Sequence, residues 1–140
     1  MTFYGYVTSR KIGPMMIPVP AQNSSLREFV LRHEGNFILP PLESFFDNCF
    51  HYLFGLLKRA ENKSVIVMYS ILMLPEETSK LYKLIYLAEA KNIRFASVLE
   101  NVIFEDSTTI KKELFTYQLQ KYTADKIILF RKYIKGTNYE

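Results

Sequence analysis

Polar side chains that could bind or transform a ligand stand where apolar strands are expected to end. Ser9 and Arg10 follow an aromatic and β-branched N-terminal segment, and Tyr69 and Ser70 follow the apolar run Val65–Met68. The planar fork of an arginine pairs with phosphate or carboxylate through two bonds, and neighbouring hydroxyls add donors. We therefore expect these four side chains to form an anion site at one edge of a sheet.

Further polar residues could form hydrogen bonds with sugar hydroxyls or act as acid and base. The full set of expected ligand-binding residues is Ser9, Arg10, Gln22, Asn23, Glu43, Tyr69 and Ser70. The catalytic candidates are Ser9, Glu43 and Glu100. An alternative stays open, in which these groups form an ordinary buried polar cluster with Arg10 paired to Glu43 or Glu100. No His or Lys base stands evidently beside Ser9, and an unactivated serine is a poor nucleophile, so the sequence leaves open whether the protein is an enzyme.

The residue types that bind metals are too few and too scattered for a metal site. His33, His51 and the single Cys49 show no zinc-like spacing, and no cofactor motif is present. Cys49 falls among apolar residues and is interpreted as a packed thiol. A lone cysteine excludes an internal disulfide and fits a reducing compartment. Because no secretory signal or apolar run of membrane-spanning length is evident, we expect a cytoplasmic protein without a membrane span.

The element that organises the chain is the unbroken apolar run Val65–Met68, which is typical of a parallel strand covered on both faces. Other strands are expected at Thr2–Thr8, Phe37–Leu39, Ile93–Val98 and, as a short fifth strand, Val102–Phe104. Helices are expected at Pro20–Glu34, Glu43–Arg59 and Glu76–Lys91, with a final helix from Asp106–Ser107 to about Lys135.

Strands that alternate with helices predict right-handed βαβ units. The expected fold is therefore a small, doubly wound α/β domain with a mostly parallel sheet of four to five strands in the order 2-1-3-4. Its switch point lies between the first and third strands, where such sheets bind ligands. The 140 residues are expected to form one domain overall, with an α/β part over residues 1–105 and a long C-terminal helix over residues 106–140.

The net charge of +4 is concentrated in the C-terminal helix, because Thr108–Lys135 contains seven Lys or Arg residues and two acidic ones. Such a helix could meet nucleic acid or an anionic surface, or it could be a solvated or partner-facing helix. Its apolar residues spread over more than one face. We therefore expect the Thr108–Lys135 helix to mediate a homodimer or larger assembly.

This layout resembles the catalytic domain of the serine recombinases (resolvases and invertases) from Tyr4 to about Tyr133. That family's first strand ends Tyr-x-Arg-Val-Ser. Here Tyr6 matches, but Thr8 stands in the arginine's place and Arg10 in the nucleophile's. The family's Asp-Arg-Leu-x-Arg motif has no counterpart in Ile71–Glu76. The resemblance implies a resolvase-like fold and helix-mediated association, and it does not imply the recombinase chemistry.

The sequence also resembles a small family of proteins from bacterial surface-carbohydrate gene clusters. The matching motifs are Gly5-Tyr6, Ser9-Arg10, Gln22-Asn23, Glu43, Tyr69-Ser70 and Leu74-Pro75. The resemblance implies a role in making lipopolysaccharide, capsule or similar glycans, without supplying a mechanism.

Three functions follow as hypotheses. The first is a carbohydrate-pathway protein that binds a sugar phosphate or nucleotide sugar where the first and third strands end. The second is a non-catalytic scaffold or regulatory subunit of a carbohydrate enzyme, held to a protein partner by the last helix. The third, ranked last because the recombinase arginines are missing, is a resolvase-like protein that binds nucleic acid.

Overall fold

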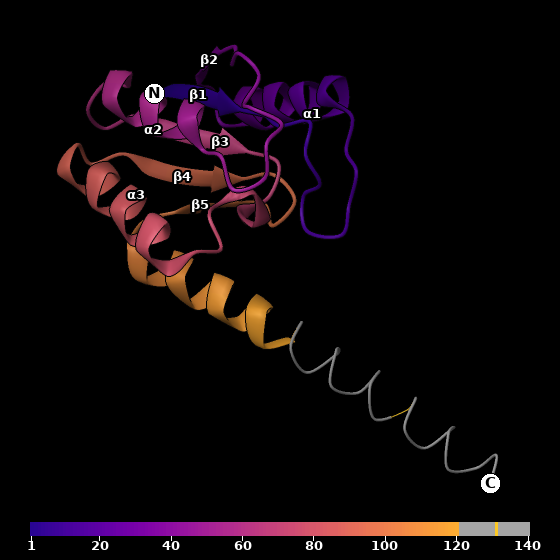
Figure 1. The fold of residues 1–140 in the computed structure, drawn as a ribbon. Helices are drawn as coiled ribbons and strands as arrows, with labels where there is room; N and C mark the ends of the chain where they lie inside the picture. Colours follow the sequence, from indigo (N-terminus) through magenta and orange to yellow (C-terminus); the bar gives the residue numbers. More distant parts are fainter. Residues whose placement is uncertain (121–130, 132–140) are drawn as a thin grey trace, which may run out of the picture. The chain divides into compact units, whose positions relative to one another are not determined.

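The computed structural model describes residues 1–120 and 131. A five-stranded sheet runs through the first of two units, Met1–Ser107, in the order β2-β1-β3-β4-β5 (Figure 1). Its strands are β1 (Thr2–Tyr6), β2 (Asn36–Ile38), β3 (Val65–Met68), β4 (Arg94–Ser97) and β5 (Val102–Phe104). The first four are parallel, and β5 pairs antiparallel with β4. The predicted α/β class, strand order and fifth strand are confirmed.

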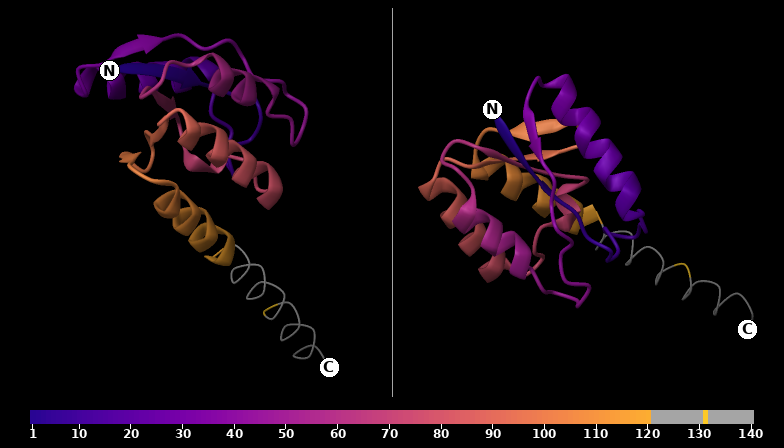
Figure 2. Two further views of the ribbon diagram at one scale, coloured as in Figure 1. Left: turned by 90° about the vertical axis from the view of Figure 1, so that its left-hand side faces the viewer. Right: turned by 90° about the horizontal axis from the view of Figure 1, so that it is seen from above.

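Helices cover both faces of the sheet, as Figure 2 shows from two directions. They are α1 (Val19–Arg32), α2 (His51–Arg59) and α3 (Thr78–Ala90), with a short 3-10 helix η1 (Ile71–Met73) after β3. The helix α1 packs its apolar side on one face, while α2 and α3 pack against the other. Every residue of β3 is buried, which explains its unbroken apolar sequence.

The core on the α1 face shows how the alternation of a strand sorts its side chains. Phe3 and Val7 of the first strand segment and Val65 and Val67 of β3 pack with α1 residues in one cluster. Alternate residues such as Tyr6 and Met68 are buried as well, on the opposite face. Both sides of the central strands are therefore dry, and polar groups gather where the strands end.

The prediction of a helix over Glu43–Arg59 is wrong in its first eight residues. The helix α2 begins at His51, and residues 43–50 form a loop in which Asn48 has a φ of 58°. Phe45 and Phe46, expected to belong to an apolar helical stripe, are 69% and 65% exposed. The reason is that the Glu43 side chain accepts hydrogen bonds from the first-turn amides of α2, so that Glu43 lies before this helix.

The loop after β1 contains a small two-residue ladder of its own. Ile12 and Met15 exchange backbone hydrogen bonds of 2.8 and 3.0 Å around Gly13, which has a φ of 58°. Ile12 is fully buried, so this part of the loop is a flap packed on the core.

The second unit, Thr108–Glu140, is described only in part. A helix runs over residues 107–120, as expected from Asp106 and Ser107. The expected continuation to about Lys135 lies, apart from Arg131, outside the described residues. Among the described residues, no helix is both long and apolar enough to cross a membrane.

Candidate functional site

The carboxyl end of β1 is tied to the start of α2 by one buried carboxylate. Glu43 is 2% exposed, and its two oxygens accept four hydrogen bonds. Oε1 accepts from the backbone N–H groups of Ser44 and Tyr52, both at 2.9 Å. Oε2 accepts from the Tyr6 hydroxyl at 2.9 Å and the Leu53 N–H at 3.0 Å. Glu43 thus caps α2 from nine residues upstream, because the amides of a helix's first turn lack partners within the helix.

Tyr6 shares this buried position. Its ring is fully buried and stacks on Tyr52 of α2, with ring centroids 6.3 Å apart. Burial raises the pKa of the Tyr6 phenol far above its ordinary value, and the Glu43 carboxylate raises it further, while Arg10 lowers it by less than either raises it. Tyr6 is therefore a neutral hydrogen-bond donor at any physiological pH.

Arg10 lies half-buried beside this pair and has an unusual set of partners. Its Nη1 donates to the carbonyls of Phe46 at 3.0 Å and Cys49 at 2.8 Å, and its Nε donates to Thr8 Oγ1 at 3.2 Å. Its guanidinium also lies 4.8 Å from the centroid of the Phe50 ring. No ion pair joins it to a carboxylate in the described part of the chain. A positive charge is thus held in a fixed position by neutral groups.

Gln22 is occupied in a structural role. It is fully buried, its Oε1 accepts from the Thr8 N–H at 3.2 Å, and its Nε2 donates to the carbonyls of Thr8 at 2.7 Å and Ile17 at 2.8 Å. The amide therefore pairs with the Thr8 backbone as a neighbouring strand would, and ties both ends of the loop after β1 to α1.

Gln22→Leu should cost about 2 kcal/mol of unfolding free energy, because it leaves the buried Thr8 backbone groups without partners. Urea unfolding followed by circular dichroism measures the effect. Gln118→Leu, on the exposed side of the helix over residues 107–120, is the control and should change little. Equal unfolding midpoints for Gln22→Leu and the wild type would contradict this role.

A second polar network follows β3. Ser70 is fully buried and donates from its hydroxyl to Glu100 Oε1 at 2.8 Å, and it caps η1 by accepting from the Leu72 N–H at 3.2 Å. Glu100 also accepts from the Ile71 N–H at 3.1 Å and from the Ser97 hydroxyl. This carboxylate joins the loops that follow β3 and β4.

Three of the expected ligand-binding residues remain without a described internal role. Ser9 is exposed, and its hydroxyl forms no hydrogen bond with a base among residues 1–120 and 131. Tyr69 is half-buried, and its hydroxyl forms no hydrogen bond with another described residue. The Oδ1 of Asn23 is a buried acceptor without a partner in the described part of the chain.

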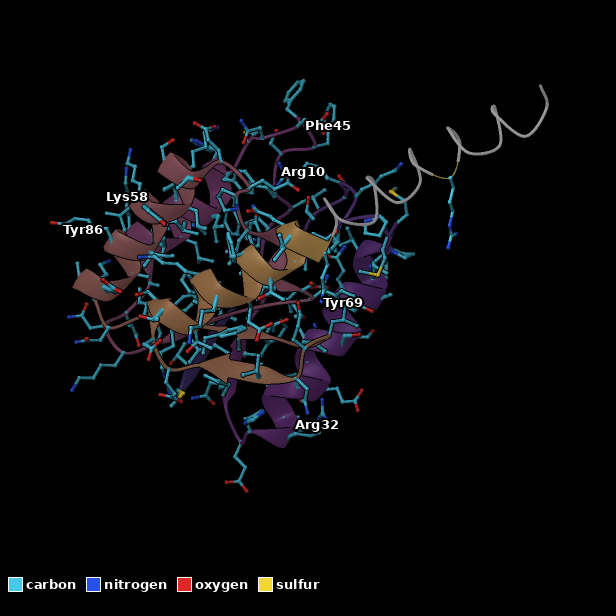
Figure 3. The ribbon with its side chains drawn as sticks, turned by 90° about the horizontal axis from the view of Figure 1, so that it is seen from below. Arg10, Arg32, Phe45, Lys58, Tyr69 and Tyr86 are labelled. Atoms are coloured by element: carbon cyan, nitrogen blue, oxygen red, sulfur yellow. The ribbon has the colours of Figure 1, made fainter. Side chains whose placement is uncertain are left out.

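The structure divides the expected residues between the faces of the sheet. Arg10 and Glu43 lie with Tyr6 on the α2 side. Tyr69 continues the alternation of Val65 and Val67, which places it on the α1 side. Figure 3 shows Arg10 and Tyr69 well apart. Among the described residues, no hydrogen bond joins the cluster around Tyr6, Arg10 and Glu43 to the cluster around Ser70 and Glu100, so the carboxyl edge holds two separate polar networks in place of the expected single one.

Sequence reasoning missed three participants, Tyr6, Thr8 and Ser97, as members of these networks. Each is a polar residue inside or directly after a predicted strand, and each is no more than 1% exposed. A polar residue at such a position is expected to be buried, and a buried polar group needs a hydrogen-bond partner, so the position itself could have indicated these networks. Among residues 1–120 and 131, no three His, Cys, Asp or Glu side chains converge as a metal site would require.

Comparison with known proteins supplies the fold and no more. No family model matches the sequence, and no curated protein matches it. The N-terminal catalytic domain of TP901-1 integrase is similar, with a TM-score of 0.61 and 11% identity over 91% of this chain and 98% of that one. A resolvase family site-specific recombinase from Streptococcus pneumoniae also has a TM-score of 0.61 and 11% identity, over 99% of both chains. The chain therefore has the resolvase-like α/β fold, and at this identity the likeness shows the fold alone.

Proposed function

We propose that this protein binds a sugar phosphate or nucleotide sugar in a bacterial surface-polysaccharide pathway, such as that of lipopolysaccharide or capsule. The pathway rests on the motif resemblance described above. The structure lends support because several motif residues, among them Tyr6, Arg10 and Glu43, share one network at the carboxyl edge of the sheet. Open α/β sheets bind their ligands at this edge.

The observation that carries the proposal is the unpaired charge of Arg10. A half-buried cation normally has an anionic partner, because desolvation is costly and neutral carbonyls compensate for it only in part. Arg10 is fixed by three acceptors and an aromatic ring, yet no described carboxylate pairs with it. A prepositioned guanidinium without a counter-ion is suited to phosphate.

The proposal assigns binding and no reaction. All four hydrogen bonds of Glu43 go to internal donors, which leaves it poorly placed as an acid or base. Ser9 has no described base within hydrogen-bond distance. Glu100 is exposed, but it already accepts three bonds that hold neighbouring loops.

Arg10→Met tests the proposal, because the substitution keeps an unbranched side chain against Phe50 and removes the charge. A ligand that binds the native state raises its melting temperature. We expect one of a panel of sugar phosphates and nucleotide sugars to raise the melting temperature of the wild type, and Arg10→Met to abolish that shift.

The matched control is Arg94→Met, which removes a guanidinium that is already paired with Glu105 at 2.9 Å. It should keep the ligand-induced shift. Loss of the shift in both variants, or its persistence in Arg10→Met, would exclude Arg10 as the anion site. A shift with duplex DNA alone would favour the nucleic-acid hypothesis.

A second candidate function is a non-catalytic scaffold or regulatory subunit of a carbohydrate enzyme. It is favoured by Tyr82 and Tyr86, which lie one turn apart on α3 and are 51% and 72% exposed (Figure 3 labels Tyr86). Self-association through the Thr108–Lys135 helix also remains a proposal, supported by the exposed Phe115 and Leu119 and testable by the particle mass in solution. A scaffold should co-purify with its partner whether or not Arg10 is present.

A further inference from the structure

An exposed apolar surface borders the Arg10 cluster. We call it the phenylalanine loop, and it consists of residues 39–46 between β2 and α2. Its exposed apolar side chains are Leu39 and Leu42, each 54% exposed, with Phe45 at 69% and Phe46 at 65%. The two phenylalanine rings stack with centroids 4.6 Å apart. Figure 3 shows Phe45 projecting outward near Arg10, which donates to the neighbouring Phe46 carbonyl.

This loop is fixed in place although its large side chains are exposed. Leu42 bridges to Val7 beside β1, and the Glu43 N–H donates to the Val7 carbonyl at 3.3 Å. Farther along, the Phe46 carbonyl is held by Arg10. Anchors at residues 42–43 and at Phe46 hold the two rings in water, where burial would otherwise be favourable. Exposed aromatic rings that are held together in this way indicate an interaction site.

The position of the Arg10 guanidinium indicates which kind of partner covers the phenylalanine loop. The Arg10 guanidinium, which has no counter-ion among the described residues, donates directly to the backbone of Phe46, so positive charge and hydrocarbon lie side by side. Lys11, the next residue after Arg10, is exposed and adds a second charge. A soluble sugar phosphate would engage Arg10 and leave Phe45 and Phe46 in water. A phosphate esterified to a lipid would engage both.

We infer that the anion bound at Arg10 is a lipid phosphate, and that the protein docks on an anionic membrane surface with Phe45 and Phe46 inserted among the lipids. This inference rests on the proposed role of Arg10 and names the class of its ligand. Aromatic rings favour the boundary between headgroups and hydrocarbon, and nearby cations are attracted by anionic lipids. The exposed Asp47, directly after the phenylalanine loop, opposes this attraction, so Asp47→Asn should strengthen binding.

Sedimentation of the full chain with vesicles tests the inference. We expect binding to phosphatidylcholine vesicles that contain phosphatidylglycerol, and little binding to phosphatidylcholine alone. The double variant Phe45→Ser, Phe46→Ser should bind on the order of tenfold more weakly, because two apolar side chains no longer leave water. Arg10→Met should also weaken binding, and added salt should weaken it further.

Leu31→Ser is the matched control, since Leu31 is 76% exposed on α1, away from the loop. It should bind as the wild type does. The Phe45 and Phe46 substitutions are at exposed positions and should leave the circular dichroism spectrum unchanged.

The outcomes separate this inference from the proposed function. Equal binding to neutral and anionic vesicles, or unchanged binding by the double phenylalanine variant, would overturn the inference. So would an absence of vesicle binding together with an Arg10-dependent thermal shift by a soluble sugar phosphate, which would leave the proposed function standing. Absence of both effects would overturn both.

Discussion

Glu43→Ala should destabilise the protein by on the order of 4 kcal/mol, a large part of the free energy of unfolding of a domain of this size. The substitution leaves four donors without their acceptor: the buried Tyr6 hydroxyl, the Ser44 N–H and the first-turn amides of Tyr52 and Leu53. It also releases the loop that precedes α2. The midpoint of urea unfolding, followed by circular dichroism, measures the loss.

Glu43→Gln tests the capping role with little change in the size of the side chain. The glutamine side chain keeps the size and one acceptor oxygen of Glu43. Its NH₂ group, however, would face the two donors from which the second carboxylate oxygen accepts hydrogen bonds in the wild type. We expect roughly half the loss seen for alanine, about 2 kcal/mol. The control is Glu77→Gln, an exposed carboxylate near the start of α3, which should have a smaller effect. A Glu43→Gln protein as stable as the wild type would remove the capping explanation.

The fold was predictable because its main signals are local. The unbroken apolar run Val65–Met68 indicates a strand with two covered faces, and the structure buries all four of its residues. Alternating strands and helices then restrict the topology, because parallel connections are right-handed. The strand order β2-β1-β3-β4 and the fifth strand at Val102–Phe104 followed from these rules.

The start of α2 was not predictable from the same rules, because the deciding contact is distant in the chain. Residues 43–50 contain apolar side chains at helical spacing, and that pattern favoured a helix. In the structure, Glu43 instead accepts hydrogen bonds from Tyr6, 37 positions away, and from the amides of Tyr52 and Leu53. Because its oxygens accept from the first-turn amides of α2, Glu43 lies before that helix. The one local sign was the Asp47-Asn48 pair, typical of a turn.

The candidate site was predicted in residue type and in position along the strands, but not in the role of each residue. Polar residues at strand ends either face a ligand or hold the loops that form the edge, and the sequence looks the same in both cases. Gln22, Glu43 and Ser70 hold loops, and their hydrogen bonds are internal. Among the candidate site residues, Arg10 is the one that combines a fixed position with a charge that lacks a described counter-ion. Because successive side chains of a strand point to opposite faces of the sheet, Tyr69 lies on the α1 side and Arg10 on the α2 side.

The stability of the wild type should fall at alkaline pH in a way that depends on Tyr6. Burial and the Glu43 carboxylate raise the pKa of the folded-state phenol far above its unfolded value of about 10. A raised folded-state pKa contributes stability that is fully present below the unfolded value. Above that pH the unfolded chain loses the phenol proton while the folded protein keeps it, so Tyr6 alone should reduce stability by about 1.4 kcal/mol per pH unit.

Tyr6→Phe isolates this contribution, because it keeps the ring that stacks on Tyr52 and removes the ionisable hydroxyl. The variant should be less stable than the wild type at neutral pH by about 1.5–3 kcal/mol, since a hydrogen bond to a carboxylate is lost. Between pH 9 and pH 11, as urea unfolding at each pH would measure, its stability should fall less steeply than that of the wild type. Tyr4→Phe, at a half-exposed position on the same strand, is the control and should keep the wild-type slope. Parallel pH profiles for Tyr6→Phe and the wild type would mean that the folded protein releases the Tyr6 proton as readily as the unfolded chain does, and that the buried pair with Glu43 does not persist in solution.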